Sequence, residues 1–298
     1  MWLHNGFSTW LLCFLVVVEK NQANCKREEN DQLDLEMKES LQKVRQAENK
    51  KRPLLVPRVI NGNDAKPNSW PWQVAILCQW TDFLYQCCGG SLINDNWVLT
   101  AAHCVSGKRV KVVSVSSFHL VWLDDSADNS PIVDVQKVII HNGYQEIKLL
   151  NDVALIKLEK PVKQSKKIKT TSLPRDRLQE GMEGTQNCYT TGWGTTEKGF
   201  TAVDLQEAQV PIVGFTRCQQ TWGDNVYQDG MICAGGDGAG NCQGDSGEPL
   251  ACKEDGRWIL RGVSSWGHLK CNVTGFFSVY SRVSYYVNWI NDEINRSQ

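Results

Sequence analysis

The sequence predicts an all-β fold over most of its length, built as a barrel or a sandwich. From Val59 onward it consists of short runs rich in Val, Ile and aromatic residues, separated by turns that contain Gly, Asn or Asp. This spacing is typical of antiparallel β proteins. Twelve cysteines spread along the chain indicate disulfides that brace such a fold. The clearest runs are 73–78, 90–93, 110–115, 133–140, 153–158, 249–253 and 258–266.

The chain begins with a short apolar run, residues 7–18, which charged residues follow. The run is too short to span a bilayer and is typical of a signal-peptide core, although the residues before it include no Lys or Arg. We expect residues 1–23 to be a signal peptide, cleaved near Ala23, and the mature protein to be secreted and extracellular. No later apolar run reaches spanning length, so no membrane partner is expected.

Residues 24–58 differ in composition, because they are rich in charge and contain neither Gly nor aromatic residues. Four apolar side chains recur there at helical spacing: Leu33, Met37, Leu41 and Val44. The segment is either a solvated, partly helical tail or an activation peptide.

The end of the chain predicts an amphipathic helix. Apolar residues recur there at helical intervals, at Val283, Val287, Ile290 and Ile294. We expect this helix to pack on the second half of the β fold in a structural role.

Charge and cysteine usage exclude several function classes. A net charge of −1 provides no basic field for nucleic acid or an anionic membrane. The cysteines form no spaced Cys/His cluster, which favours disulfides in an oxidising compartment and leaves a zinc site as the minor alternative. We expect no metal and no other cofactor.

Nucleophilic chemistry is indicated by Ser246, which lies inside the tight-turn sequence Gly-Asp-Ser-Gly at 244–247. A serine hydroxyl is a poor nucleophile unless a base lies nearby. The motif alone is a weak signal, because it is also an ordinary turn sequence. Its weight comes from His103 and Asp152, which supply a base and an orienting carboxylate in the chain order His, Asp, Ser.

These segments resemble the trypsin/chymotrypsin family of serine proteases, and within it the pancreatic chymotrypsin and elastase branch. The resemblance extends from Val59 to about Asn295. It implies two six-stranded antiparallel β-barrels with the active site in the cleft between them, a C-terminal α-helix and a protease domain over residues 59–298. Besides the three catalytic segments, the matching motifs are Trp70-Pro71-Trp72-Gln73-Val74, Cys88-Gly89-Gly90-Ser91-Leu92-Ile93, Thr191-Gly192-Trp193-Gly194, Met231-Ile232-Cys233-Ala234-Gly235 and Ser265-Trp266-Gly267.

The resemblance favours the activation peptide for residues 24–58. Arg58 precedes Val59 as in family precursors, where cleavage after the basic residue by a trypsin-like protease frees a new amino terminus. That ammonium would pair with Asp245, the aspartate before the nucleophile. Breaking a buried pair of this kind costs about 3–5 kcal/mol.

The resemblance also implies a role for each residue of the active site. Ser246 would be the nucleophile and His103 the general base and acid, while Asp152 orients the ring. The backbone N–H groups of Gly244 and Ser246 would form the oxyanion hole. The segment 265–267, Ser265, Trp266 and Gly267, would pair with the substrate backbone as an added strand.

The specificity pocket is expected to be open and uncharged. The resemblance implies that Gly240 stands at its base, where a carboxylate would favour Arg or Lys, and that Gly267 stands at its wall. Ser278 is expected at the last lining position, with Asn241 and Gln243 completing the substrate-binding residues. Such a pocket suits Leu, Phe, Tyr or Met at P1, and the Asn241 amide leaves a polar P1 side chain open.

The family disulfides carry over as Cys88–Cys104, Cys188–Cys252, Cys218–Cys233 and Cys242–Cys271. Three cysteines remain once residues 1–23 are removed. Cys78 and Cys87 flank a short turn segment and could bridge as a hairpin. Cys25 could pair with either of them or with another chain.

Three features depart from the family pattern. Glu248 replaces a glycine of the nucleophile loop, and it either strains the loop by about 1–3 kcal/mol or points away and is tolerated. Phe118 stands where calcium-binding relatives carry a glutamate, so no calcium site of that kind is expected, although Asp124, Asp125 and Asp128 lie nearby. Two glycosylation sequons begin at Asn272 and Asn295; the first abuts the pocket rim, where we expect no glycan.

We therefore expect a secreted serine endopeptidase, made as a zymogen, that cleaves after bulky apolar residues. Its partners would be protein or peptide substrates, an activating trypsin-like protease and protein protease inhibitors. A trypsin-like enzyme is disfavoured by Gly240. The alternative from another class is a catalytically impaired homologue that acts as a binding protein, which Glu248 favours.

Overall fold

The computed structural model describes residues 62–80, 83–108, 110–116, 118, 131–175, 187–194, 202–238, 240–242, 244–268, 271 and 273–297. The chain divides into two units, Met1–Leu55 and Val56–Gln298, and every described residue belongs to the second. Several expectations lie outside the described residues: the signal peptide, the activation peptide with Cys25, the Arg58–Val59 junction, Gln243, Asn272 and the three aspartates near Phe118.

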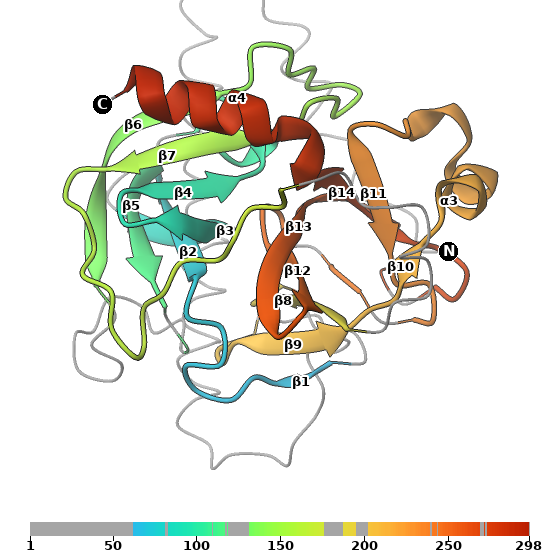
Figure 1. The fold of residues 1–298 in the computed structure, drawn as a ribbon, viewed down its shortest axis with the longest axis horizontal. Helices are drawn as coiled ribbons and strands as arrows, with labels where there is room; N and C mark the ends of the chain where they lie inside the picture. Colours follow the sequence, from blue (N-terminus) through green and yellow to red (C-terminus); the bar gives the residue numbers. More distant parts are fainter. Residues whose placement is uncertain are drawn as a thin grey trace, which may run out of the picture. The chain divides into compact units, whose positions relative to one another are not determined.

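The first sheet is a closed barrel of strands in the order β2-β3-β4-β7-β6-β5 (Figure 1). All its pairings are antiparallel, and β5 closes the barrel against β2 by pairing Val115 with Val74. Four consecutive residues are buried in each of β2 and β5, at 73–76 and at 112–115, so neither face of these stretches is open to solvent. The strands are β2 (Gln73–Trp80), β3 (Phe83–Asn94), β4 (Trp97–Thr100), β5 (Val110–Val115), β6 (Ile132–Ile140) and β7 (Ala154–Leu158).

The second sheet has 8 strands in the order β1-β9-β8-β12-β13-β14-β11-β10. The family resemblance implied a second closed barrel; here the described strands form an open, half-barrel sheet, whose end strands β1 and β10 are only 2 residues long. The all-β class is confirmed. The strands are β1 (Asn63–Asp64), β8 (Cys188–Gly192), β9 (Gln206–Gln209), β10 (Ile212–Val213), β11 (Met231–Ala234), β12 (Pro249–Glu254), β13 (Arg257–Trp266) and β14 (Ser278–Arg282).

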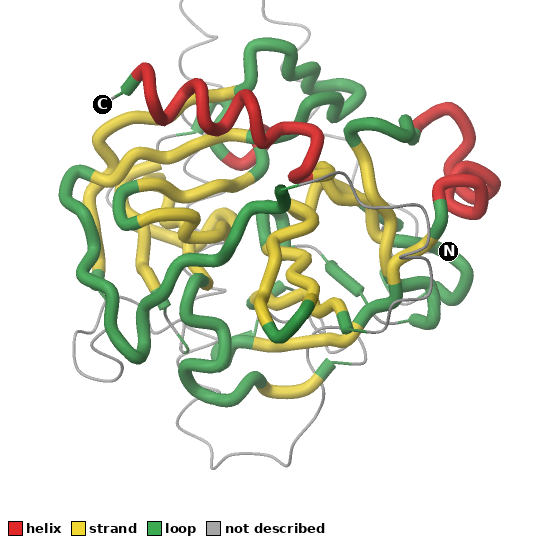
Figure 2. The backbone as a smooth tube through the Cα atoms, in the orientation of Figure 1, coloured by secondary structure: helices red, strands yellow, loops and turns green. Residues whose placement is uncertain are grey.

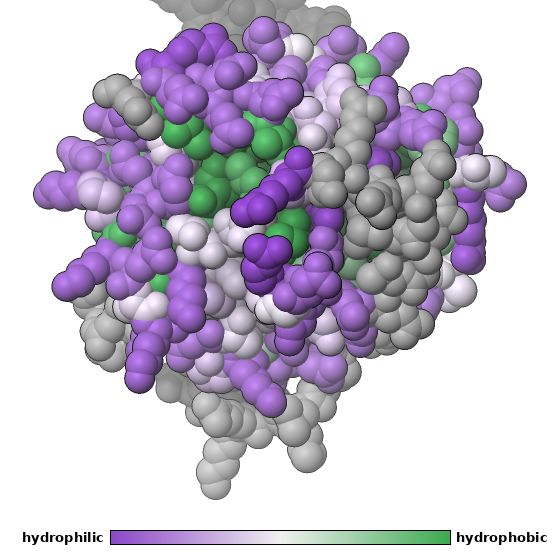
Figure 3. Space-filling model, viewed as in Figure 1, coloured by the Kyte–Doolittle hydropathy of each residue, from purple (hydrophilic) through white to green (hydrophobic). Residues whose placement is uncertain are grey.

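The described residues include two α-helices, α3 (Phe215–Trp222) at the right and α4 (Val283–Arg296) along the top of the view in Figure 2. Short 3₁₀ turns occur at 102–104 (η1) and 223–225 (η2). Of the expected apolar stripe of α4, Val283 and Ile290 are buried, and the other two members are half-buried against the core. The expected C-terminal amphipathic helix is therefore present, and it contacts β13 of the second sheet. Most of the surface in this view is hydrophilic, with a hydrophobic area beside α4 (Figure 3).

One apolar core joins the barrel and the sheet. Part of it is an aromatic cluster in which Trp70 packs against Trp258 of β13, with ring centroids 4.8 Å apart, and against Trp72, at 5.7 Å. Tyr189 of β8 completes the cluster. These contacts link the segment before β2 to the second sheet, and edge-to-face pairs of this kind add about 0.5–1.5 kcal/mol each beyond the area they bury.

The ten described cysteines form five disulfides. The four family pairs are present, and Cys78 bridges to Cys87 across the β2–β3 hairpin, so neither of these two is left for Cys25. None of the described helices is long and apolar enough to cross a membrane.

Candidate active site

The imidazole of His103 lies on η1, the 3₁₀ turn that directly follows β4. The Cys88–Cys104 disulfide ties this turn to β3, so the base is attached to the barrel on both sides. The His103 side chain is 21% exposed, which leaves one edge of the ring accessible. This placement follows from the sequence, since a buried strand leads directly into the Ala-Ala-His-Cys segment.

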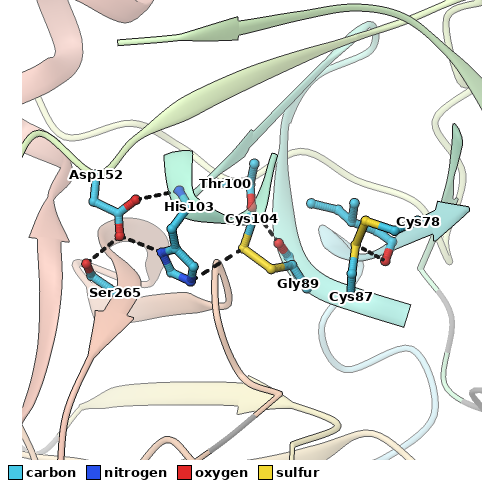
Figure 4. Close-up of a disulfide and its surroundings, with 10 residues drawn as sticks. Cys78, Cys87, Gly89, Thr100, His103, Cys104, Asp152 and Ser265 are labelled. Atoms are coloured by element: carbon cyan, nitrogen blue, oxygen red, sulfur yellow. Dashed lines mark hydrogen bonds and ion pairs between the residues drawn. A yellow bond between two sulfur atoms is a disulfide. The ribbon is translucent and has the colours of Figure 1, made fainter. Parts of the chain in front are cut away.

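Asp152 is fully buried and binds His103 twice (Figure 4). Its Oδ2 lies 2.7 Å from His103 Nδ1, and its Oδ1 accepts the His103 backbone N–H at 2.9 Å. Because a carboxylate can only accept, Nδ1 carries the hydrogen and Nε2 presents its lone pair. Ser265 Oγ donates a further hydrogen bond to Oδ2, which fixes the carboxylate.

Two residues that sequence reasoning missed bind the Asn151–Asp152 segment. Ser281 Oγ donates to the Asp152 carbonyl oxygen at 2.8 Å, and Tyr286 of α4 donates through its hydroxyl to Asn151 Oδ1 at 3.3 Å. Asn151 itself has a positive φ of 51°, a conformation that asparagine tolerates better than most residues. No sequence signal marks Ser281 or Tyr286, because both are more than a hundred residues away along the chain.

The nucleophile loop is anchored to the first barrel. The Gly89 N–H of β3 donates to the Ser246 carbonyl oxygen at 2.8 Å. Gly247 has φ 79°, and a Cβ there would lie 2.5 Å from Gly89 O and 3.2 Å from Cys104 Sγ. Cys104 Sγ in turn lies 3.9 Å from His103 Nε2. The loop therefore lies beside the His103 turn, although the structure records no hydrogen bond between the Ser246 hydroxyl and the ring.

The N–H groups expected to form the oxyanion hole belong to Gly244 and Ser246. Neither donates a recorded hydrogen bond to another described residue. Gly244 has φ 96°, a left-handed conformation that a side chain would oppose.

The expected pocket residues meet at one place. A Cβ at Gly240 would lie 2.9 Å from Ser278 Oγ, and a Cβ at Gly267 would lie 3.7 Å from Ser278 Cα. Gly267 follows β13 directly and is exposed, as a rim residue should be. The two glycines leave space on either side of Ser278, and these three residues contribute no charge.

The amide of Asn241, which left a polar P1 open in the sequence analysis, is already engaged. Its Oδ1 accepts a hydrogen bond from Thr190 Oγ1, and its Nδ2 donates to Ser264 Oγ at 2.6 Å. The amide therefore joins β8 to β13 instead of standing free in the pocket.

The strand segment expected to bind the substrate backbone lies at the end of β13. Ser265 is buried, and its hydroxyl binds Asp152, while Trp266 is half-buried. The Trp266 ring packs edge-on against Trp222 of α3, with centroids 5.0 Å apart. Gly267 beyond it presents open backbone.

Asp245 is buried, 1% exposed, next to the nucleophile. Its two carboxyl oxygens accept backbone N–H groups from Gly194 at 2.7 Å and from Cys242 at 2.8 Å. Burial raises the pKa of Asp245 to about 7, against these two hydrogen bonds, which lower it. None of the ion pairs among the described residues involves Asp245.

The structure contradicts both alternatives that the sequence left open for Glu248, an outward-pointing side chain and a strained loop. It does not point away, because its side chain is fully buried. Its backbone is also not among the residues with positive φ, so the loop is not strained at that position. Glu248 Oε2 instead accepts a hydrogen bond from Gln73 of β2, and burial is the first of the causes that raise its pKa well above the ordinary value.

The described residues include one cluster with the spacing of metal ligands, Cys88, His103 and Cys104. The two cysteines are joined in a disulfide and cannot act as thiolate ligands. Phe118, whose position argued against a calcium site, packs against the apolar core.

Comparisons with known proteins agree with this arrangement. The protein-family model described as Trypsin matches residues 59–290, beginning at the expected activation junction. Chymotrypsin-C of Mus musculus is 40% identical over 248 residues, which cover 81% of this chain and 91% of that protein. Chymotrypsin-C of Bos taurus is 38% identical over 250 residues, covering 82% and 91%.

Proposed function

Because the chain belongs to the trypsin family and is a chymotrypsin-like serine endopeptidase, we propose that it is secreted as an inactive precursor. Cleavage after Arg58 activates it, and a His103–Asp152–Ser246 triad then hydrolyses peptide bonds after bulky apolar residues. The observation that carries the triad is the buried Asp152 carboxylate, which holds His103 by both its ring and its backbone N–H.

Acylation begins at Ser246. Its Oγ attacks the scissile carbonyl carbon as His103 Nε2 takes the hydroxyl proton, and Asp152 stabilises the imidazolium that forms. The oxyanion accepts hydrogen bonds from the Gly244 and Ser246 N–H groups. Loss of one donor of this kind costs about 2.7–4 kcal/mol of transition-state stabilisation.

Collapse of that intermediate breaks the C–N bond, and His103 gives its proton to the leaving amine. Water then attacks the acyl-serine with His103 again as base, which releases the carboxylic acid and restores Ser246.

Specificity is proposed from the shape and neutrality of the pocket. Gly240 at the base brings no carboxylate, so an Arg or Lys substrate side chain would lack an ion-pair partner. Gly267 and Ser278 leave the entrance open. With the Asn241 amide already bonded to two side chains, apolar P1 residues such as Leu, Phe, Tyr and Met fit best.

The precursor hypothesis is supported by the matched domain, which begins directly after Arg58. It is also supported by the buried Asp245 carboxyl, which a newly formed Val59 ammonium would neutralise. The activating enzyme would be a trypsin-like protease, since the cut follows arginine. Protein protease inhibitors are further proposed partners, because they bind the same cleft as substrates.

The proposed specificity is tested with the trypsin-treated protein and a peptide library that varies P1. Cleavage should follow Leu, Phe, Tyr or Met, and the Ser246→Ala variant, cut in the same way, should cleave nothing. Preference for Lys or Arg would contradict the pocket assignment. Correct cutting without peptidase activity would favour the binding-protein alternative, which Glu248 in the nucleophile loop first suggested.

A further inference from the structure

Glu248 is a buried carboxyl group that the proposed catalytic cycle does not use. Gln73 Nε2 donates to its Oε2, while the Gln73 Oε1 accepts from Thr191 Oγ1 at 2.6 Å, so the amide is oriented toward Glu248. The other carboxyl oxygen, Oε1, has no hydrogen-bond partner among the described residues. A fully buried oxygen with no donor is an unfilled acceptor.

Two glycines make the space for this side chain. A Cβ at Gly89 would lie 1.9 Å from Glu248 Cδ, and a Cβ at Gly192 would lie 3.1 Å from Glu248 Cγ. The same Cβ at Gly192 would lie 2.2 Å from Asp245 Oδ1. The side chains of Asp245 and Glu248 are therefore neighbours against the Gly192 backbone.

The groups packed around Glu248 leave its charge without compensation. Gln73 faces it from β2, Gly89 from β3 and Gly192 from β8, and none of these titrates. Asp245 faces it from its own loop, and its charge also raises the pKa of Glu248. Beyond them lies Tyr280 of β14, whose pKa is raised by burial and also by the charge of Asp245. The recorded contacts of the two carboxyls among the described residues include no cation, and two buried carboxyls cannot both ionise without one.

We propose that Asp245 and Glu248 together form a two-carboxyl site for a single ammonium group, whose occupant is the α-ammonium of Val59 after cleavage at Arg58. This inference rests on the proposed activation by that cleavage. Each Asp245 oxygen already accepts one backbone N–H and keeps further acceptor capacity, while Glu248 Oε1 is unfilled. An ammonium brings three donors to these acceptors.

The burial of the site selects the kind of cation. Asp245 is 1% and Glu248 0% exposed, so a hydrated ion from solvent has no open approach. A chain end created by cleavage can fold into the interior and carry one positive charge. Glu248 thereby becomes a positioning residue, because holding the chain end holds the Asp245–Ser246 loop.

The consequence to measure is the basicity of the new amine. Two neighbouring carboxylates hold the ammonium proton more tightly than one. The pKa of the Val59 amine should lie well above the ordinary range of about 7.7–8.0 for an α-amino group. It should fall by about one pH unit or more when Glu248 becomes glutamine, which keeps the size of the side chain and its acceptor for Gln73.

The experiment compares wild type, Glu248→Gln and Glu248→Gly after trypsin cleavage, with the cut verified by mass. The pKa of the Val59 amine is read from its rate of acetylation by acetic anhydride as a function of pH, a readout that needs no activity. The alkaline limb of kcat/KM is measured in parallel. Glu254→Gln is the control, because Glu254 likewise accepts a side-chain N–H, from Arg261 Nε at 2.7 Å, but lies at the far end of β12, where that strand turns into β13.

A lower amine pKa in both Glu248 variants, with the control unchanged, supports the inference. An identical pKa in wild type and both variants overturns it, even if all of them are active. If cleavage yields no activity while the amine pKa still depends on Glu248, the two-carboxyl site stands and the proposed activation fails.

Discussion

Single residues decide how wide the substrate pocket is, and Gly267 is the position where this can be tested most simply. We expect Gly267→Val to reduce kcat/KM for Phe and Tyr at P1 by 10-fold or more, since its methyl groups enter the open side of the pocket, and to leave Ala at P1 less affected. A Cβ there has room, 3.7 Å from Ser278 Cα, so the fold should tolerate the change. Cleavage kinetics on paired peptide substrates measure the effect. Unchanged kinetics on the Phe peptide would show that Gly267 does not line the pocket.

Residue burial also predicts a pH dependence for the uncleaved chain. Asp245 goes from an ordinary 3.8 to a pKa of about 7 on folding, and the pKa of Glu248 is raised well above 4.5. A carboxyl with a raised pKa binds its proton more tightly when folded, so folding stability falls as pH rises from the unfolded toward the folded pKa. For Asp245 this loss should occur between about pH 4 and about pH 7, and the raised pKa of Glu248 adds to it above about pH 4.5.

Glu248→Gln removes one of these two ionisations. The Tm difference between the variant and wild type, both uncleaved, should be small at pH 5 and grow to a few degrees in favour of the variant by pH 8. Thermal melts across this range measure it. A difference that does not vary with pH would mean that Glu248 does not titrate in the folded chain.

The sequence could not predict where the Glu248 side chain goes. Its space is made by Gly89 and Gly192, which lie on different strands and far away in the sequence. From the sequence, Glu248 could be recognised only as the replacement of a glycine in a tight loop, which predicts either backbone strain or an outward-pointing side chain. By contrast, His103 and Asp152 were found from sequence because each lies in a recognisable local segment.

Individual helices and turns position the catalytic residues through a few side-chain contacts. Helix α4 supports the aspartate loop through Tyr286, whose hydroxyl binds Asn151 and lies 2.8 Å from the hydroxyl of Tyr227. We expect Tyr286→Phe to cost about 0.5–1.5 kcal/mol of unfolding free energy, since two half-buried partners lose its hydroxyl, and to lower kcat. Tyr285→Phe is the control, because Tyr285 is 41% exposed and its change should stay within about 0.5 kcal/mol. Urea unfolding and steady-state kinetics of both variants distinguish them; equal effects would contradict the role of Tyr286.

The 3₁₀ turn with His103 depends on one disulfide. Replacing Cys88 and Cys104 together by alanine opens a loop with a sequence separation of 16 and should cost about 2–4 kcal/mol. It should also lower kcat, because the base is then attached to the barrel on one side only. The matched control is the pair Cys78 and Cys87, with a separation of 9, in the hairpin away from His103. Its removal should lower stability with little change in kcat, and a similar kcat loss in both variants would contradict the specific role of the first bridge.

Some strands and the C-terminal helix could be predicted from the sequence, whereas other features of the two sheets could not. The strands at 73–80, 110–115, 249–254 and 257–266 match the sequence runs closely, because each contains at least four consecutive buried residues. Helix α4 matches because its apolar residues recur at helical spacing. The Cys78–Cys87 bridge was one of several open pairings, and the hairpin register selects it by bringing the two ends of the turn together. The open edge of the second sheet was not expected, because its two end strands are too short to leave a periodic pattern.

At the scale of the whole molecule, the chain joins a long charged N-terminal segment to a protease domain that the family model matches from residue 59. The central claim is that one cut between them converts Ser246 from an unreactive to a reactive nucleophile. The described residues that support this claim are the His103–Asp152 pair, the Ser246 loop bonded to Gly89, and the buried Asp245.

The most direct test is intact mass spectrometry of the purified full-length protein before and after trypsin, each with a serine-directed fluorophosphonate. We expect a single adduct, located on Ser246, that appears only after the cut between Arg58 and Val59. A correct cut without an adduct would contradict activation by this cleavage, and so would an adduct that forms equally well on the uncut chain.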